Sequence, residues 1–193
     1  MPKIVDRDRY RKELLQKCFD LFARKGYGSL TMRQIAKELK VSTGTLYHYF
    51  PSKEAIFVRL IEEVTDNDIL MVTDEFQGLE TIEAKIEAFG QFLIKNEEYY
   101  YKQTLLFFNF FQQPELEQPE LKEAIQKSSE RYQKFIMELL DIDDPAIANH
   151  IYCAIDGLMS QRAFGLKSVS ITQQMELLSK MILAYLGTKS RPQ

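Results

Sequence analysis

The chain of 193 residues contains no tryptophan, two cysteines and two histidines. Cys18 and Cys153 are far apart and each lies in an apolar stretch, so they predict neither a disulfide framework nor a metal-binding pattern. We expect both thiols to be buried and reduced, as in the cytosol. The two histidines form no cluster with cysteines and carboxylates, which argues against a metal site.

Long apolar runs are also absent. No run of 18 apolar residues occurs, so we expect no membrane-spanning helix. No apolar segment follows the N-terminal methionine, which predicts no signal peptide and a cytoplasmic location. The sequence has no glycine-rich phosphate loop and no nucleophile elbow, and its carboxylates alternate with lysines as on solvated helix faces. We therefore expect no enzyme and no cofactor.

The charge is small in total but uneven along the chain. The net charge is -3, yet residues 1–60 carry 13 Lys and Arg against 6 Asp and Glu, a net +7. Residues 61–193 carry the opposite balance, a net -10. A basic segment joined to an acidic one is expected where only one end of a protein meets a polyanion. The N-terminal segment is therefore the candidate for nucleic-acid binding.

Helical periodicity dominates the rest of the sequence. Apolar residues recur at spacings of three and four, and no segment alternates with a period of two, which predicts an all-α protein of about nine helices. A first helix contains Leu14–Phe22 and is followed by two short helices up to Pro51. Further helices are expected near residues 53–72, 81–95, 98–112, 119–140, 145–165 and 171–186.

The two short helices have complete start signals. Thr31 and Gln34 are spaced as a capping box, and Ser42 can cap the second of the two helices. Pro51 ends that second helix, because proline disfavours helical geometry in the preceding residue. Two short helices separated by "KVS" form a helix-turn-helix, in which the second helix enters the major groove of DNA.

The second short helix is expected to present a polar outer face. On a helical wheel Leu46 and Phe50 point inward, whereas Gly44 and His48 lie on the opposite side. The hydroxyl, imidazole and phenol groups near this side can bind phosphates or base edges, and the glycine permits close approach. Lys53 starts the next helix, where free backbone N–H groups favour an anion, so we expect it to grip a phosphate. A purely structural use of these aromatic residues is the less favoured alternative.

The stretches "FARKGYGSLT" and "LTMRQIAKELKVSTGTLYHYFPSKEAI" resemble the TetR family of bacterial transcriptional regulators over about the first third of the chain. The resemblance implies an all-α homodimer, with a DNA-binding head at residues 1–52 and a ligand-binding and dimerisation body at residues 53–193. Lys40 stands where the family usually has glycine, and a left-handed conformation there would cost about 1–2 kcal/mol. The positions implied to contact DNA are Thr31, Arg33, Thr43, Gly44, Thr45, Tyr47, His48, Tyr49 and Lys53.

The body is rich in aromatic residues, many of them between Tyr99 and Phe111. A helix in this region is apolar nearly all round and should be central. Its rings either line a ligand cavity, with a few polar groups fixing orientation, or form solid core, and for any single phenylalanine solid core is favoured. The residues expected to line a pocket are Tyr101, Leu105, Phe108, Asn109, Gln112 and Tyr152.

The last two helices are expected to form the dimer interface. Each has an apolar stripe, and two such helices doubled by a two-fold axis make a four-helix bundle. His150, Asp156 and Arg162 lie among apolar neighbours in the first of them, as ligand contacts or, as we favour, polar pairs at the interface. The predicted interface residues are Ile155, Met159, Arg162, Leu178, Ile182 and Tyr185.

Together these features predict a repressor that binds palindromic operator DNA as a homodimer and responds to a small lipophilic or aromatic effector. Two rival functions are a helical carrier of apolar small molecules and a helical enzyme. The basic head argues against the carrier, and the missing catalytic constellation argues against the enzyme. The sequence names neither the effector nor the operator, and it leaves open whether the effector releases or promotes DNA binding.

Overall fold

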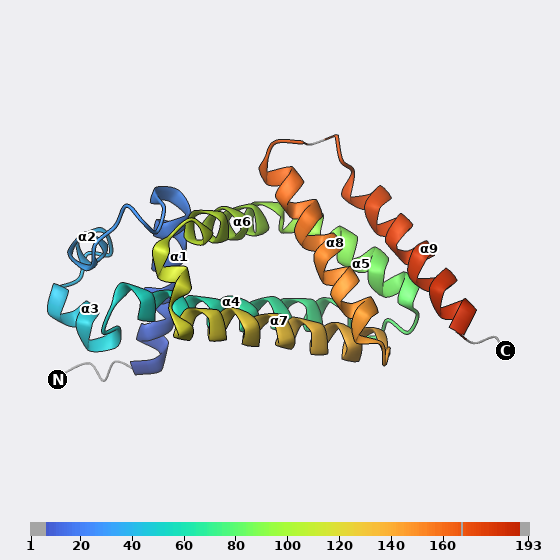
Figure 1. Cartoon of the computed structure of the whole chain (residues 1–193), viewed down its shortest axis with the longest axis horizontal. Helices are drawn as coiled ribbons and strands as arrows, with labels where there is room; N and C mark the ends of the chain where they lie inside the picture. Colours follow the sequence, from blue (N-terminus) through green and yellow to red (C-terminus); the bar gives the residue numbers. More distant parts are fainter. Residues whose placement is uncertain (1–6, 167, 190–193) are drawn as a thin grey trace. The chain divides into compact units, whose positions relative to one another are not determined.

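The computed structural model describes residues 7–166 and 168–189, and within them the chain is helical with no strand (Figure 1). The all-α prediction is therefore confirmed, and the expected helices fall within a few residues of the observed ones. The helices are α1 (Arg7–Lys25), α2 (Met32–Glu38), α3 (Thr43–Tyr49), α4 (Lys53–Glu75), α5 (Ile82–Lys95), α6 (Glu97–Phe111), the short 3-10 helix η1 (Pro114–Glu117), α7 (Pro119–Leu140), α8 (Pro145–Ala163) and α9 (Ile171–Lys189).

The described residues divide into two compact units. The head unit comprises the residues up to Asp66 together with Lys102–Ser128, and the body unit comprises Asn67–Tyr101 and the residues from Ser129 onward. Helices α4, α6 and α7 each contribute residues to both units. Compact packing thus divides the chain inside α4, beyond the predicted boundary between residues 52 and 53.

The core of the head unit is built around Tyr27, which is fully buried in the loop after α1. Its ring makes edge contacts with Phe22, Phe57 and Phe110, at centroid distances of 5.5, 5.3 and 4.9 Å. Phe57 and Phe110 stack at 3.6 Å. Aromatic residues near the end of α6 therefore serve as solid core for the head.

At residue 28 this loop approaches the side chain of Gln113, which follows α6, so a larger residue there would have to displace that flexible side chain. A Cβ atom there would lie 2.3 Å from Oε1 of Gln113, which is far inside normal contact distance. Gly26 has a φ of +79°, a left-handed conformation that glycine adopts without strain. The sequence "KGYG" thus lets the loop lie flat against the C-terminal end of α6.

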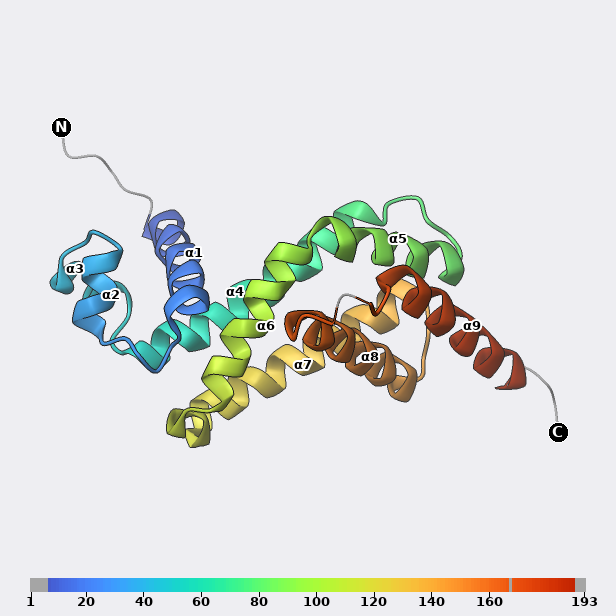
Figure 2. The same ribbon diagram turned by 90° about the horizontal axis from the view of Figure 1, so that it is seen from above.

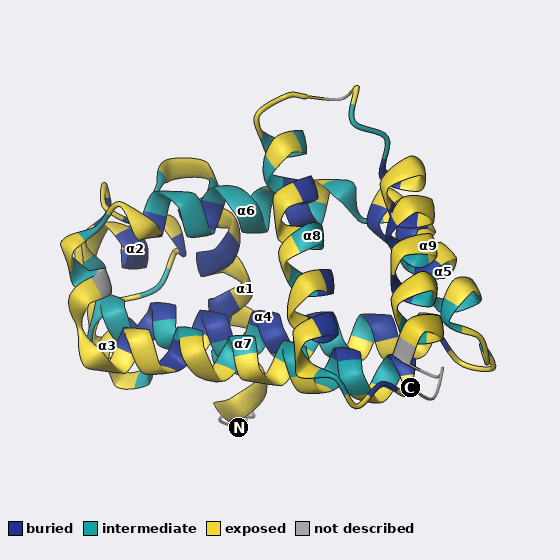
Figure 3. Ribbon diagram, turned by 45° about the vertical axis from the view of Figure 1, so that its right-hand side comes forward, coloured by how far each residue is buried: buried dark blue, intermediate teal, exposed yellow. Residues whose placement is uncertain are grey.

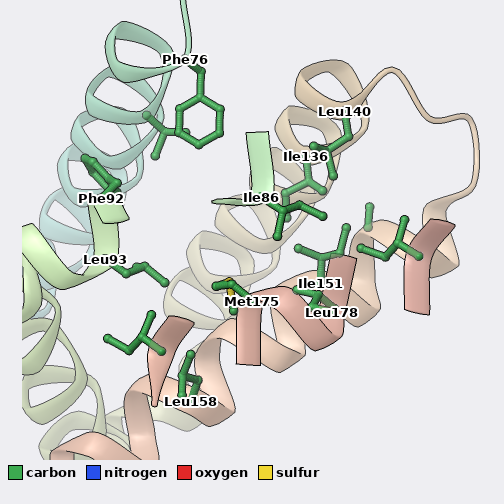
Figure 4. Close-up of a cluster of buried hydrophobic side chains, with 14 of the residues drawn as sticks. Phe76, Ile86, Phe92, Leu93, Ile136, Leu140, Ile151, Leu158, Met175 and Leu178 are labelled. Carbon is green, nitrogen blue, oxygen red and sulfur yellow. The ribbon is translucent and has the colours of Figure 1, made fainter. Parts of the chain in front are cut away.

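The core of the body unit lies between α5, α8, α9 and parts of α4, α6 and α7 (Figure 4). Helix α9 packs along α5 (Figure 2), and a Cβ atom at Gly90 of α5 would lie 3.0 Å from Cγ of Met175. Aliphatic side chains fill most of the remaining space, including Ile86, Leu158 and Leu178. None of the helices in the described ranges has the length and apolar character that a membrane crossing requires.

The two cysteines differ in their surroundings. Cys18 is buried on the inner side of α1, and burial raises the pKa of its thiol to about 12. Cys153 is exposed on α8, so the prediction that both thiols are buried is wrong for this residue. Its apolar neighbour Ile151 faces the core, and residue 153 lies half a turn further round the helix.

Candidate nucleic-acid interface

Helices α2 and α3 are stabilised at their starts by the predicted caps. Oγ1 of Thr31 accepts a hydrogen bond from the backbone N–H of Gln34 at 3.4 Å, and Oε1 of Gln34 accepts one from the N–H of Thr31 at 2.8 Å. Oγ of Ser42 accepts from the N–H of Thr45 at 2.9 Å. These bonds satisfy N–H groups that a helix start leaves free, so two helices of seven residues each can form.

The two faces of α3 differ in burial as the helical wheel predicts (Figure 3). Leu46 and Phe50 are fully buried against the head core. On the other side the structure gathers four of the predicted DNA-contacting residues on one exposed surface, which we call the α3 outer face. Its members are Thr43, Gly44, Tyr47 and His48.

Two further candidates lie at the edge of this face and are half-buried. The Thr45 hydroxyl lies 2.7 Å from Oγ of Ser42, within the cap. The Tyr49 ring lies 5.4 Å from the ring of Tyr10 and 5.1 Å from that of His48. Both residues therefore support the exposed neighbours, while Thr31 and Arg33 are exposed at the start of α2.

Arg7 is a residue at this surface that the sequence reasoning did not single out. Its guanidinium lies 3.4 Å from Nε2 of His48, although the two residues are 41 positions apart. Arginine only donates hydrogen bonds, so Nε2 accepts and the imidazole proton is assigned to Nδ1. In the sequence, the signal for Arg7 was the positive charge of the N-terminal segment. The fold places Arg7 beside α3.

The turn between α2 and α3 contains Lys40, which stands where the TetR family usually has glycine. Lys40 has a φ of 56°, so it adopts the left-handed conformation without being glycine. The backbone N–H of Val41 donates to the carbonyl of Ala36 at 3.0 Å, which closes the end of α2. The turn therefore keeps this closure, and the exposed lysine adds a positive charge next to α3.

The side chain of Lys53 is held by partners within the head unit, and its role in binding a phosphate stays a prediction. Its side chain is 15% exposed, and Nζ lies 4.0 Å from Glu115. The same ammonium donates to the carbonyl of Tyr27 at 3.3 Å and sits 4.0 Å above that ring. Lys53 thus fastens the loop after α1 to the start of α4, and binding a phosphate would require it to leave these partners.

The residues expected to line a pocket fall in different compact units. Leu105, Phe108 and Asn109 are half-buried in the head unit, where Asn109 donates to the carbonyl of Leu105 at 2.8 Å. Gln112 is exposed there, and in the body unit Tyr101 is exposed whereas Tyr152 is half-buried. The structure therefore does not bring these six residues together within one unit.

The predicted interface residues also differ in burial. Met159, Leu178 and Ile182 are buried in the core of their own body unit, so a partner chain cannot contact them directly, and this part of the prediction is corrected. Arg162 binds Glu97 at 2.6 Å and the carbonyl of Val169 at 3.0 Å. Ile155 is half-buried and Tyr185 is 46% exposed.

Tyr185 belongs to a set of large apolar residues that are exposed on α9 and directly after α8. We call this set the C-terminal apolar face. The sequence showed them as apolar but did not separate them from their buried neighbours one or three positions away. They are Phe164, Leu177, Met181 and Tyr185.

Comparison with known proteins agrees with this geometry. Residues 14–60 match the family model of the bacterial regulatory proteins of the tetR family. The N-terminal part of the chain is therefore a DNA-binding region of the TetR type. The matched segment contains both helices of the helix-turn-helix and the start of α4.

Among curated relatives, the HTH-type transcriptional regulator HbdR of Aromatoleum sp. (strain CIB) is 35% identical over 78 residues, which are 40% of this chain and 33% of that protein. The negative transcriptional regulator IcaR of the icaADBC biofilm operon of Staphylococcus aureus (strain Newman) is 27% identical over 92 residues, 47% of this chain and 49% of that protein. The matched segment thus covers less than half of the length of each of these two relatives.

Similarity of fold to a solved structure extends over nearly the whole chain. A transcriptional regulator from Saccharomonospora viridis, solved in complex with choline, superposes with a TM-score of 0.72. The superposition covers 91% of this chain and 96% of that chain, at 18% sequence identity. At this identity the likeness shows a shared architecture, so the residues of the body have to be interpreted from their own chemistry.

Proposed function

We propose that this chain is a TetR-family transcriptional repressor that acts in the cytoplasm, binds palindromic operator DNA as a homodimer and responds to a small molecule. The observation that carries the proposal is the α3 outer face, where polar side chains and a glycine are exposed on a short, capped helix beside Arg7. The negative regulator among the relatives supports repression as the sense of control.

In the proposed complex α3 lies in the major groove. Tyr47 and Thr43 approach base edges, and Gly44 allows the backbone to come close to the DNA. Arg7, Arg33 and Lys40 neutralise neighbouring phosphates, which strengthens binding at every sequence. Sequence preference in this arrangement comes from the residues of α3, and most of the affinity comes from the surrounding cations.

A palindrome requires two heads, so the proposal includes a second copy of the chain. Half-sites one helical turn apart demand heads about 34–36 Å apart, which a symmetric dimer supplies. The C-terminal apolar face is the surface we assign to this contact. Large apolar side chains there lie in water in the single chain, and a four-helix bundle with a partner would bury them.

The proposed effector binds the body and changes operator affinity only if it favours one of the head arrangements over another. We retain a lipophilic or aromatic small molecule as the effector class. A carrier of apolar small molecules is the alternative function, and it would show ligand binding without any specific DNA binding.

The test of DNA binding uses fluorescence anisotropy with the DNA upstream of the chain's own gene. Tyr47→Ala should weaken specific binding by about 1–3 kcal/mol, because a base contact is lost. Tyr101→Ala is the matched control, since Tyr101 is similarly exposed but lies on α6. Equal affinity of Tyr47→Ala and wild type, with unchanged helicity, would refute the assigned role of α3.

The test of the dimer uses light scattering at micromolar concentration. Met181→Glu places a charge in the C-terminal apolar face and should give monomers that no longer bind the operator. Gln174→Glu adds the same charge at an exposed polar position of α9 and should leave the dimer intact. A wild-type protein that is monomeric at this concentration would contradict the homodimer.

A further inference from the structure

A charged residue lies in the otherwise apolar interior of the body unit. Asp68 of α4 is 5% exposed, and Thr65 and Asp68 are the buried polar or charged residues among those that the structure describes. Removing a carboxylate from water is unfavourable unless neighbouring groups stabilise its charge. The identity of those neighbours therefore indicates what the position is suited to bind.

Tyrosines from three other helices gather near this carboxylate. The hydroxyl of Tyr132 on α7 donates to Oδ2 of Asp68 at 2.6 Å. The ring of Tyr152 on α8 stacks on that of Tyr132 at 5.4 Å, with 21° between the ring planes. Tyr99 and Tyr100 of α6 are in edge contact at 5.2 Å. We call these five residues the tyrosine–aspartate cluster, and all of them belong to the body unit.

The negative charge of Asp68 acts on Tyr99, Tyr100 and Tyr152. Burial, and then the charge of Asp68, raise the pKa of Tyr99 and of Tyr100. Burial raises the pKa of Tyr152, with smaller effects of Asp156 and of Asp68. The tyrosines therefore remain neutral phenols. Burial disfavours charge of either sign, and it is the smaller effect of the Asp68 charge that disfavours phenolates and favours a cation placed among the rings.

We propose that the tyrosine–aspartate cluster binds an organic ammonium ion and that this cation is the effector. The faces of tyrosine rings carry partial negative charge and attract an ammonium group within about 6 Å of the ring centre. The carboxylate of Asp68 balances the charge of the ligand. Cation binding stands on the cluster alone, and only its role as effector rests on the proposed function.

The surroundings favour an organic cation over a metal ion. A metal such as magnesium or calcium requires six or more oxygen ligands, whereas the cluster offers one carboxylate, phenols and ring faces. An alkylammonium ion is weakly hydrated and its methyl groups pack against rings. The two ranges of the body unit, 67–101 and 129–193, carry 9 Lys and Arg against 15 Asp and Glu, a net charge of -6, which raises the local concentration of cations around the body.

Access is expected on the side of α7 and α8. Tyr132 and Tyr152 are half-buried, and Cys153 and Asp156 next to them on α8 are exposed. In the proposal the ligand reaches Asp68 past this stacked pair of rings, whose side chains would have to rotate to admit it. This arrangement places the aromatic part of a ligand near the surface and its ammonium group at the carboxylate.

The test is calorimetric titration of the full chain with benzyltrimethylammonium and with 2-methyl-1-phenylpropan-2-ol, a neutral alcohol of nearly the same shape. We expect the cation to bind at least tenfold more tightly than the alcohol. Asp68→Asn should weaken cation binding at least tenfold. Asp74→Asn, an exposed carboxylate of the same helix, should bind the cation as the wild type does.

The proposal is overturned if no cation binding is measured, if the alcohol binds as tightly, or if Asp68→Asn keeps wild-type affinity. Should Asp68→Asn fail to fold, Tyr152→Phe and Tyr152→Leu decide instead. The phenylalanine keeps the ring and should keep cation affinity, whereas the leucine should lose at least threefold. Equal affinities of these two variants would also overturn the proposal.

Operator binding is measured separately and without the cation, so the two proposals fail independently. Specific DNA binding without cation binding would refute the cluster as a cation site and would not affect the proposed function as a regulator. Cation binding without specific DNA binding would establish the site and refute the regulator. Binding of both, with operator affinity changed by the cation, would support the ammonium ion as effector.

Discussion

The head and body units of this chain are specified by different kinds of sequence information. In the head, the helix-turn-helix depends on caps at Thr31 and Ser42 that bind backbone groups three residues away. In the body, the tyrosine–aspartate cluster joins Asp68 to Tyr132 across 64 positions of sequence. A DNA-binding element that depends on short-range sequence signals can be recognised in the sequences of many proteins. A site formed by packing between distant residues can differ from one protein body to the next.

The largest expected effect tests how far the head depends on residues remote in sequence. Phe110→Ala removes a ring stacked on Phe57 in the head core and should lower the free energy of unfolding by about 3–5 kcal/mol. Phe111→Ala, at a neighbouring position that is 48% exposed, should cost much less. Urea denaturation measures both. Similar losses in the two variants would contradict the role of Phe110 in the head core.

A second effect compares ion pairs of equal length in the two units. Arg162 and Arg59 each lie 2.6 Å from a glutamate, but their side chains are 14% and 54% exposed. Arg162→Ala should lower the free energy of unfolding by about 1–3 kcal/mol, because it leaves partly buried acceptors without their donor. Arg59→Ala should cost about 0–1 kcal/mol, since the pair is in water.

Chemical denaturation of both arginine variants checks this contrast. Arg162→Lys should not restore stability, because lysine cannot bind Glu97 and the carbonyl of Val169 in the same planar geometry. Equal stability of Arg162→Ala and Arg59→Ala would show that burial does not separate the two pairs.

A third effect compares helix caps. Thr31→Ala in the head and Thr81→Ala in the body each remove an N-cap hydroxyl and should cost about 1 kcal/mol. The loss should be larger at Thr31, because its cap includes the returning bond from Gln34. Thermal and urea unfolding measure the difference. A larger loss at Thr81 would mean that the short helices of the head depend less on capping than proposed.

The smallest expected effect concerns two residues with left-handed backbone conformations. Lys40 in the head and Asp141 in the body have φ values of 56° and 53°. Replacing either by glycine relieves this strain and should raise the free energy of unfolding by about 0.5–1 kcal/mol after the entropy cost of glycine. Lys40→Gly should also weaken DNA binding and reduce its salt dependence, which Asp141→Gly should not do. Stability unchanged in both variants would argue that neither turn is strained.

The local signals of the sequence were sufficient for the helices and for the head. The caps at Thr31 and Ser42, the stop at Pro51 and the inner positions Leu46 and Phe50 all lie as predicted. The partners of Lys53 within the head, Tyr27 and Glu115, could not be predicted, because they come from a loop and from the segment after α6. A helix start attracts anions in general, but the fold decides where the lysine side chain points.

The body shows why periodicity alone is insufficient for a functional surface. The apolar pattern of α9 marks Leu177, Leu178, Met181 and Ile182 alike, whereas the structure buries Leu178 and Ile182 and exposes the other two. Packing of α9 against α5 makes this distinction, and it involves helices distant in sequence. For the same reason the sequence singled out Tyr152 without its neighbours Asp68 and Tyr132.

The contrast between the two cysteines has a practical consequence for spectroscopy. Cys18 is buried with a thiol pKa of about 12, so almost none of it is present as the reactive thiolate near neutral pH. Cys153 is exposed on α8, directly after Tyr152 in the sequence. A maleimide fluorophore should therefore attach at one position of the unmodified chain. Such a label would report on α8 during ligand titration without the introduction of any new residue.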